Sequence, residues 1–209
     1  MTVSVLNKIA YLQNRRDEVP NQELAKELAG TKNKKGIKEI AENLWSQDKN
    51  IQFDCVKVLY EIGYVDPDLI ADYVDDFLRL LKNKHNRLVW GGMLALSTIA
   101  GLKPKAIYEN LETIYSTMQE GSVITIDNGI KVLSKLASDN VEYNKKIFPF
   151  LIDHLKNCRP KDVAQHSESI VQAVNPSNKN EFVSVLKQRE VAMSPSQIAR
   201  IKRLYKKIE

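Results

Sequence analysis

The sequence predicts an all-α protein, a right-handed α-α superhelix of about five stacked helix pairs. Three observations lead to this prediction. Apolar residues recur at helical spacing along most of the chain, and two different helix patterns alternate on one period of 37 residues. Only 8 Gly and 7 Pro occur among 209 residues, too few for the many turns of a strand-rich fold.

The first helix of each pair is clearest in the segment that follows Pro67. Val74, Phe77 and Leu81 are three and four residues apart, which places their side chains on one face of a helix. The equivalent residues 37 positions later are also apolar: Leu111, Ile114 and Met118. The proline recurs as well, as Pro104.

The second helix of each pair follows the same period. Its apolar face in the first complete pair is formed by Cys55, Val58, Leu59 and Ile62. The equivalent positions in the next two pairs are small or apolar: Gly92, Ala95, Leu96 and Ile99, then Gly129, Val132, Leu133 and Leu136. One pair cannot bury such a face alone, so we expect neighbouring pairs to stack and share a continuous core.

These patterns predict a single α-solenoid domain over residues 1–209. Residues 1–30 form capping helices, with a leading helix over 2–16. About four repeats of about 37 residues occupy 33–174, and a C-terminal capping helix pair occupies 178–209.

Local signals refine the last repeat and the C-terminal cap. Pro149 lies inside the helix expected over 140–157 and should kink or split it. Ser194 before Pro195 predicts an N-cap followed by a first helical turn. The final helix carries a basic side, formed by Arg200, Lys202, Arg203, Lys206 and Lys207. We expect this side to be solvated, and a contact with nucleic acid or acidic lipid is the alternative.

A proline opens the first helix of a repeat, and a small residue closes the second helix at Gly63, Ala100 and Ala137. In these features the repeats resemble HEAT or armadillo-type units. The resemblance covers most of the chain and carries the fold, not an activity. It implies a curved stack in which the second helices line the concave face.

Residues 37 positions apart should then be lateral neighbours on that face, about 10 Å from one another. The candidate binding residues on the concave face are Phe53, Lys57, Arg87, Trp90, Asp127, Lys131 and Lys135. A basic rim is predicted at one edge, formed by Lys34, Lys35, Lys82 and Lys84.

Trp90 precedes two glycines inside a helix, Gly91 and Gly92. Each glycine costs about 1 kcal/mol relative to alanine, so the fold must need their small size. One explanation is the close approach of a neighbouring helix. The other is room for a ligand or a base beside the Trp90 ring.

The sequence predicts a non-enzymatic binding or scaffold module whose partner is another protein. No phosphate loop, nucleophile elbow or zinc-protease motif occurs, so no catalytic residue, cofactor or metal site is predicted. The histidines, His85, His154 and His166, are expected to form no close pair with each other or with a cysteine. Cys55 and Cys158 are expected to be reduced. Without a signal peptide or a run of about 18 apolar residues, a cytoplasmic protein with no membrane contact is expected.

The alternative function is nucleic-acid binding, which a net charge of +5 makes plausible. In fold and size the chain resembles a bacterial family of alkylpurine DNA glycosylases built of HEAT-like repeats. That family holds DNA in its concave groove and uses aromatic residues with an aspartate near the lesion. The resemblance implies this role for Trp90 and Asp127. The chain departs from the family at Gly91 and Gly92, where basic residues would be expected.

Overall fold

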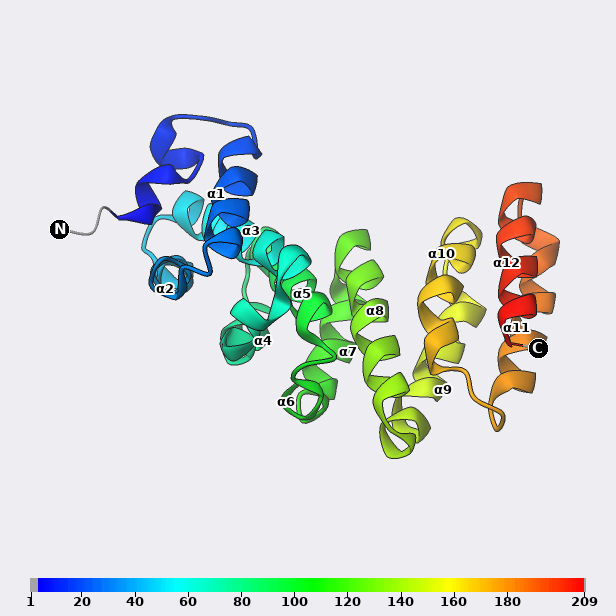
Figure 1. Cartoon of the computed structure of the whole chain (residues 1–209). Coiled ribbons are helices and arrows are strands. Elements are labelled where there is room, and N and C mark those ends of the chain that lie inside the picture. Colours follow the sequence, from blue (N-terminus) through cyan, green and yellow to red (C-terminus); the bar gives the residue numbers. More distant parts are fainter. Residues whose placement is uncertain (1–3, 209) are drawn as a thin grey trace. The chain divides into compact units, whose positions relative to one another are not determined.

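The structure is a computed structural model that describes residues 4–208, and its regular elements there are all helices. The chain divides into two compact units, one up to Asn128 and one from Gly129 onward. The first unit contains α1 (Val19–Gly30), α2 (Lys34–Glu42), α3 (Lys49–Val65), α4 (Val74–Leu80), α5 (Asn86–Ile99), α6 (Pro104–Tyr108) and α7 (Leu111–Glu120) (Figure 1). Helix α8 (Val123–Asp139) contains the division. The second unit continues with α9 (Val141–Asn157), α10 (Pro160–Ile170), α11 (Lys179–Arg189) and α12 (Pro195–Ile208).

The helix starts confirm the period of 37 residues. The second helices of four successive pairs, α3, α5, α8 and α10, begin at Lys49, Asn86, Val123 and Pro160. Each start lies 37 positions after the one before it. The stretch therefore consists of repeats of one length, as the apolar spacing predicts. The prediction that all of them form one domain remains a prediction.

The core of the first unit is built by the second helices. Helix α3 packs against α1 on one side and α5 on the other, and α4 covers α5 (Figure 1). The residues of the predicted apolar faces are buried, and Leu59, Ile62, Phe77, Leu96 and Ile99 are fully buried. Burying each of these side chains contributes about 1.5–3 kcal/mol, so stacking supplies most of the stability.

Helix packing explains the two glycines after Trp90. A Cβ atom on Gly91 would lie 2.8 Å from a methyl carbon of Val56 on α3. A Cβ atom on Gly92 would lie 2.9 Å from the Cβ of Leu80 and 3.0 Å from the main-chain oxygen of Phe77, both on α4. Both glycines therefore allow helices to approach closely, which confirms the first of the two explanations.

The first helices of two repeats are broken, although the apolar spacing after Pro67 and after Pro104 predicts one continuous helix in each repeat. In the earlier repeat, two 3-10 turns (Pro67–Leu69 and Ala71–Tyr73) precede α4, and in the later repeat α6 precedes α7. The break recurs at Tyr73 and Asn110, 37 positions apart, where φ and ψ are −93° and 18° and then −113° and 22°. The Asn110 side chain donates to the Ala106 carbonyl oxygen at 2.9 Å, which competes with the helical hydrogen bonds.

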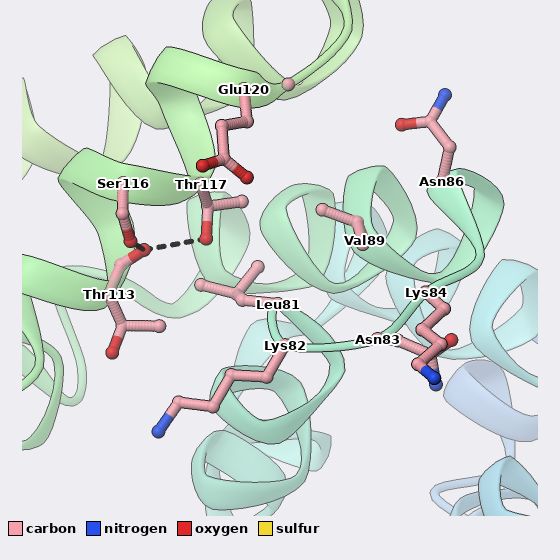
Figure 2. Close-up of a pocket in the computed structure, with 11 residues that line it drawn as sticks. Leu81, Lys82, Asn83, Lys84, Asn86, Val89, Thr113, Ser116, Thr117 and Glu120 are labelled. Atoms are coloured by element: carbon pink, nitrogen blue, oxygen red, sulfur yellow. Dashed lines mark hydrogen bonds between the residues drawn. The ribbon is translucent and has the colours of Figure 1, made fainter.

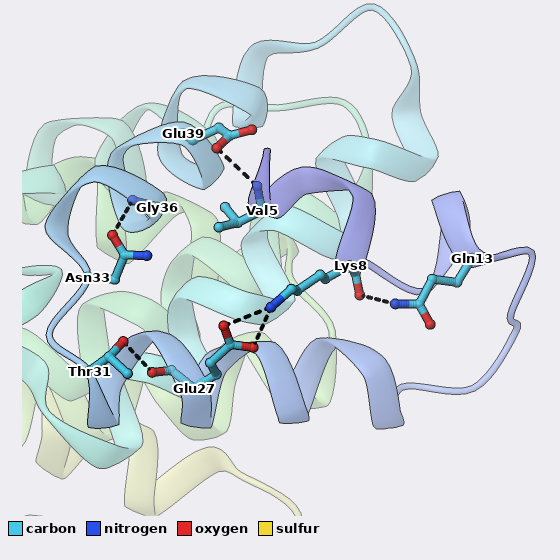
Figure 3. A network of polar contacts seen from close by, with 8 residues as sticks. All are labelled: Val5, Lys8, Gln13, Glu27, Thr31, Asn33, Gly36 and Glu39. Atoms are coloured by element: carbon cyan, nitrogen blue, oxygen red, sulfur yellow. Dashed lines mark hydrogen bonds and ion pairs between the residues drawn. The ribbon is translucent and has the colours of Figure 1, made fainter. Parts of the chain in front are cut away.

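The predicted leading helix over 2–16 is wrong for the part that the structure describes, and residues 2 and 3 lie outside the described residues. Two 3-10 turns occur instead, Val5–Lys8 and Tyr11–Gln13. Tertiary contacts hold this segment: the Lys8 ammonium donates to both Glu27 carboxylate oxygens at 2.7 and 2.8 Å, and the Val5 amide donates to Glu39 at 3.2 Å (Figure 3). An apolar stripe at helical spacing therefore packs here without forming an α-helix.

In the second unit, α9 packs on α10 and α11, and α10 packs on α12. Pro149 lies within α9 and does not split it. The proline ring is exposed, so the Lys145 carbonyl that loses its helical donor lies on the solvent side of the helix. Of the two expected effects of Pro149, the split is therefore wrong, and the kink stays a prediction.

Ser194 caps α12, as predicted from the sequence. Its hydroxyl accepts from the Gln197 amide at 3.4 Å, and the Gln197 side-chain oxygen accepts from the Ser194 amide at 2.8 Å. This reciprocal pair is a capping box. On the basic side of α12, Arg200 forms two hydrogen bonds to the Glu168 carboxylate of α10 at 2.8 and 2.6 Å. Arg200 thus fastens the terminal helix to its neighbour.

Candidate functional site

Two of the predicted binding residues, Phe53 on α3 and Arg87 on α5, lie against each other. The Arg87 guanidinium lies 5.1 Å from the centre of the Phe53 ring, a cation–π contact between the two helices. The Phe53 ring also meets the His85 ring edge-on at 6.2 Å between centroids. These contacts join residues 34 and 32 positions apart, so the second helices of successive repeats are neighbours, while the lateral pairing of residues 37 positions apart stays a prediction.

Trp90 belongs to a chain of aromatic rings. Its ring lies 6.1 Å from the Tyr60 ring, and the Tyr60 ring lies 6.1 Å from the Tyr64 ring, measured between centroids. Tyr60 is buried, Trp90 is half-buried, and Tyr64 is 57% exposed. We call the surface formed by Phe53, Tyr60, Tyr64, Arg87 and Trp90 the α3–α5 face.

Lys57 does not belong to the exposed part of this surface, contrary to the prediction. Its side chain is only 8% exposed, and its ammonium contacts Glu18 at 2.8 Å and Glu61 at 2.7 Å. Burial alone would lower the pKa of Lys57, but the hydrogen bonds with these carboxylates outweigh burial and raise it. Lys57 is therefore a charged residue that joins α1 to α3, not a free ligand for a partner.

A hollow of about 340 Å³ lies beside the α3–α5 face, between α3 and the N-terminal segment. Its lining carries charges of both signs: Arg15, Arg16, Asp17, Glu18, Asp54 and Arg87. Arg15 pairs with Asp17 at 2.8 Å, and Asp54 accepts from the Tyr11 amide at 2.7 Å. The hollow is therefore polar and close to neutral, and it does not form a positive groove.

The remaining predicted face residues belong to α8. Asp127 is half-buried and lies in the first unit, next to the division of the chain. Lys131 and Lys135 are exposed and lie in the second unit. On the predicted rim, Lys34 and Lys35 are exposed at the start of α2. The pKa of Asp72 is lowered mainly by its hydrogen bond with Lys103, and the charge of Lys34 adds a smaller effect.

Lys82 and Lys84 of the predicted rim line a second pocket of about 490 Å³, between the loop after α4 and helix α7. In Figure 2, Leu81 and Val89 lie between Thr117 on one side and Lys84 on the other. The Thr117 hydroxyl donates to the Thr113 carbonyl oxygen at 2.6 Å, and the Ser116 hydroxyl donates to the same oxygen at 3.1 Å. These hydroxyls satisfy their own helix, so the pocket offers polar contacts and no activated nucleophile.

The second unit contains a cluster that contradicts the expectation for the histidines. His154 Nε2 and His166 Nδ1 are 2.9 Å apart. Cys158 joins them, and the ligand atoms of the three residues all lie within 4.8 Å of one another. Burial raises the pKa of the Cys158 thiol to about 11, and the nearby Arg189 guanidinium opposes this rise. Both cysteines are free thiols, as expected.

Several of these functional residues are not evident from sequence reasoning. Tyr60 and Tyr64 have a signal, because aromatic residues four positions apart share one helix face. His154 and Cys158 have the same spacing. Glu18 has none, since its contact with Lys57 depends on how the irregular N-terminal segment folds over α3.

Within residues 4–208, no helix has both the length and the apolar character that crossing a membrane requires.

The sequence matches no family model and no curated protein. Solved structures give clear matches. A designed armadillo repeat protein in complex with the peptide (KR)4 is similar at a TM-score of 0.69 and 12% identity, over 88% of this chain and 85% of that chain. A computationally designed armadillo repeat protein for modular peptide recognition is similar at a TM-score of 0.67 and 11% identity, over 97% of both chains.

A natural protein is also similar. The karyopherin Kap121p, solved bound to the SUMO protease Ulp1p, matches at a TM-score of 0.68 and 10% identity. The match covers 98% of this chain and 23% of the karyopherin. At these identities the likeness concerns the fold: the chain has an all-α repeat fold of the armadillo/HEAT type, as the sequence predicts.

Proposed function

We propose that this chain is a non-enzymatic binding module that holds a segment of another protein on the α3–α5 face. One observation carries the proposal: aromatic rings of two successive repeats meet on α3 and α5, with Tyr64 and Trp90 on the buried Tyr60 ring and Arg87 over the Phe53 ring. Tryptophan, tyrosine and arginine are the residues that dominate the energetics of protein interfaces.

The fold supports this proposal. Repeat proteins of the armadillo/HEAT type are typical protein-binding scaffolds, and the structural neighbours include one in complex with a peptide and one bound to a protease. Extended surfaces of stacked repeats suit long, linear partners. We expect the partner of this chain to differ from (KR)4 in not being purely basic. Glu18 and Glu61 are already paired with Lys57, so a purely basic peptide would find few carboxylates without a cation here.

The nucleic-acid alternative has less support. A binder of the phosphate backbone needs cations that are free to meet phosphates. Beside the α3–α5 face, Lys57 is buried and paired with the carboxylates of Glu18 and Glu61. Arg87 lies over the Phe53 ring and 4.0 Å from Glu18.

The proposal is tested by selecting peptides from a displayed random library with the whole chain. The affinity of a selected peptide for each variant is then measured by the fluorescence anisotropy of a dye attached to the peptide. We expect Trp90→Ala to weaken binding by about 30-fold or more, as loss of a central aromatic anchor does. Val191→Ala is the matched control, because Val191 is 93% exposed in the other unit. The affinity of this variant for the selected peptide should be unchanged.

Two results would overturn the proposal. One is that no peptide is enriched over a blank surface while labelled duplex DNA binds with a steep salt dependence. The other is that the selected peptides bind the Trp90→Ala variant as tightly as they bind the unaltered face. The peptide (KR)4 serves as a fixed comparison and should bind more weakly than the selected sequences.

A further inference from the structure

The His154, Cys158 and His166 cluster has the composition and placement of a metal site. His154 and Cys158 are one helical turn apart at the end of α9, and the imidazole of His166 reaches them from α10. His166 is 2% exposed and Cys158 is half-buried. Three donor atoms from two adjacent helices therefore converge at the turn that joins those helices.

The donor set selects a class of metal. Two imidazole nitrogens and one thiolate sulfur suit Zn²⁺, whereas Mg²⁺ and Ca²⁺ prefer oxygen ligands. Zn–N bonds of about 2.0–2.1 Å and a Zn–S bond of about 2.3 Å in a tetrahedron separate two nitrogens by about 3.4 Å and nitrogen from sulfur by about 3.6 Å. The donor atoms here are 2.9 Å apart for the two nitrogens and no more than 4.8 Å apart in any pair.

We propose that His154, Cys158 and His166 bind one zinc ion. Binding needs a rearrangement of about 1 Å or less at each donor. The proton shared between the two imidazole nitrogens moves to another ring nitrogen or to water, and the thiol releases its proton to solvent as the Zn–S bond forms. Three protein ligands leave the fourth position to a water molecule.

The surroundings of the cluster hold its donors in place. The Cys158 amide donates to the His154 carbonyl oxygen at 2.8 Å, which completes the last turn of α9. The Arg189 guanidinium of α11 donates to the carbonyl oxygens of Lys156 and Cys158. Arg159 is paired with Asp162 at 2.6 Å. Charges of both signs therefore flank the cluster. Binding adds the two positive charges of Zn²⁺ to the site and removes one proton from the Cys158 thiol.

A bound ion would link the end of α9 to the middle of α10. Because the site joins two consecutive helices, its expected effect is to stabilise the second unit. This site is far in sequence from the α3–α5 face and belongs to the other unit, so it is independent of the proposed binding function.

The test uses the whole chain, stripped with chelator and titrated with Zn²⁺ or with Co²⁺ as a spectroscopic probe. We expect one ion per chain, tetrahedral Co²⁺ bands in the visible, and a thiolate-to-cobalt charge-transfer band. Cys158→Ser should abolish the charge-transfer band, and His166→Gln should weaken Zn²⁺ binding by about 100-fold or more, because even outer-shell changes commonly cost 10- to 100-fold. His85→Gln is the matched control and should bind Zn²⁺ as the unaltered chain does.

A second measurement needs no variant, so it holds even if His166→Gln fails to fold. Zn²⁺ should protect Cys158 from alkylation, scored by mass spectrometry of the peptide that contains it. Cys55 is fully buried and serves as the internal reference. The proposal is overturned if Co²⁺ gives only octahedral spectra, if Cys158 is alkylated equally fast with and without Zn²⁺, or if Cys158→Ser retains the charge-transfer band.

Discussion

Replacing Gly92 by alanine should destabilise the protein, although alanine is the better helix former. The new Cβ would lie 2.9 Å from the Cβ of Leu80 and 3.0 Å from the main-chain oxygen of Phe77. Favourable carbon contacts lie at about 3.5–4.0 Å, so α4 and α5 would have to separate by about half an ångström. Neither of the two atoms can rotate away, because one is a Cβ and the other is main chain.

The magnitude follows from two opposing effects. Overpacking of a core costs about 1–3 kcal/mol, and the gain in helix propensity from glycine to alanine is about 1 kcal/mol. We expect a net loss of about 0–2 kcal/mol in the free energy of unfolding.

Gly30 provides the matched control, since it ends α1 and a Cβ there would meet no atom within 4 Å. Gly30→Ala should therefore stabilise the protein by about 0.4–1 kcal/mol. Both variants are measured by urea unfolding, followed by far-ultraviolet circular dichroism. If Gly92→Ala were as stabilising as Gly30→Ala, the argument from close helix packing would be refuted.

Three further predictions concern polar contacts. Lys57→Met should lower the free energy of unfolding in urea by about 1–3 kcal/mol. The loss is smaller than for a fully buried pair because the Glu18 side chain is 50% exposed. An unchanged unfolding midpoint would contradict the role of Lys57 in joining α1 to α3. Asn144→Ala should lower the free energy of unfolding by about 2–4 kcal/mol in the same assay. The Asn144 amide donates to the Ala137 and Ala173 carbonyl oxygens at 2.9 and 2.7 Å, and both oxygens would lose a buried donor. A loss below about 1 kcal/mol would contradict this role. The hydrogen bond from Arg200 lowers the pKa of Glu168 below its usual 4.5, so this pair stabilises the fold above that pH and its contribution is lost as the pH falls further. Glu168→Gln should remove that part of the pH dependence of the melting temperature, which is worth under about 1 kcal/mol at such exposed side chains, and an unaltered acid profile would count against it.

The binding face illustrates what could be predicted about the candidate site. The lateral pairing of α3 with α5 follows from the repeat length, so a contact between these two helices such as that of Phe53 with Arg87 is predictable from the sequence. The state of Lys57 is not, because it depends on Glu18, which lies 39 positions away on an irregular segment. Local sequence patterns carry no information on such a contact between distant residues.

The histidine cluster shows the same limit. The one-turn spacing of His154 and Cys158 is visible in the sequence, but the approach of His166 depends on how α10 turns back on α9. The loop between these helices sets the relative rotation of the two helices, and a residue pattern with a period of 3.6 does not define that rotation.

By itself the sequence determined the helical class, the repeat length and the buried face of most helices. These properties are periodic, and burial of apolar side chains enforces the same period in the fold. Only the tertiary structure decided which first helices break, where the N-terminal segment packs, and which polar side chains meet. Those outcomes depend on single contacts between residues distant in sequence, where a hydrogen bond or an ion pair of about 1 kcal/mol selects among conformations that the apolar pattern treats alike.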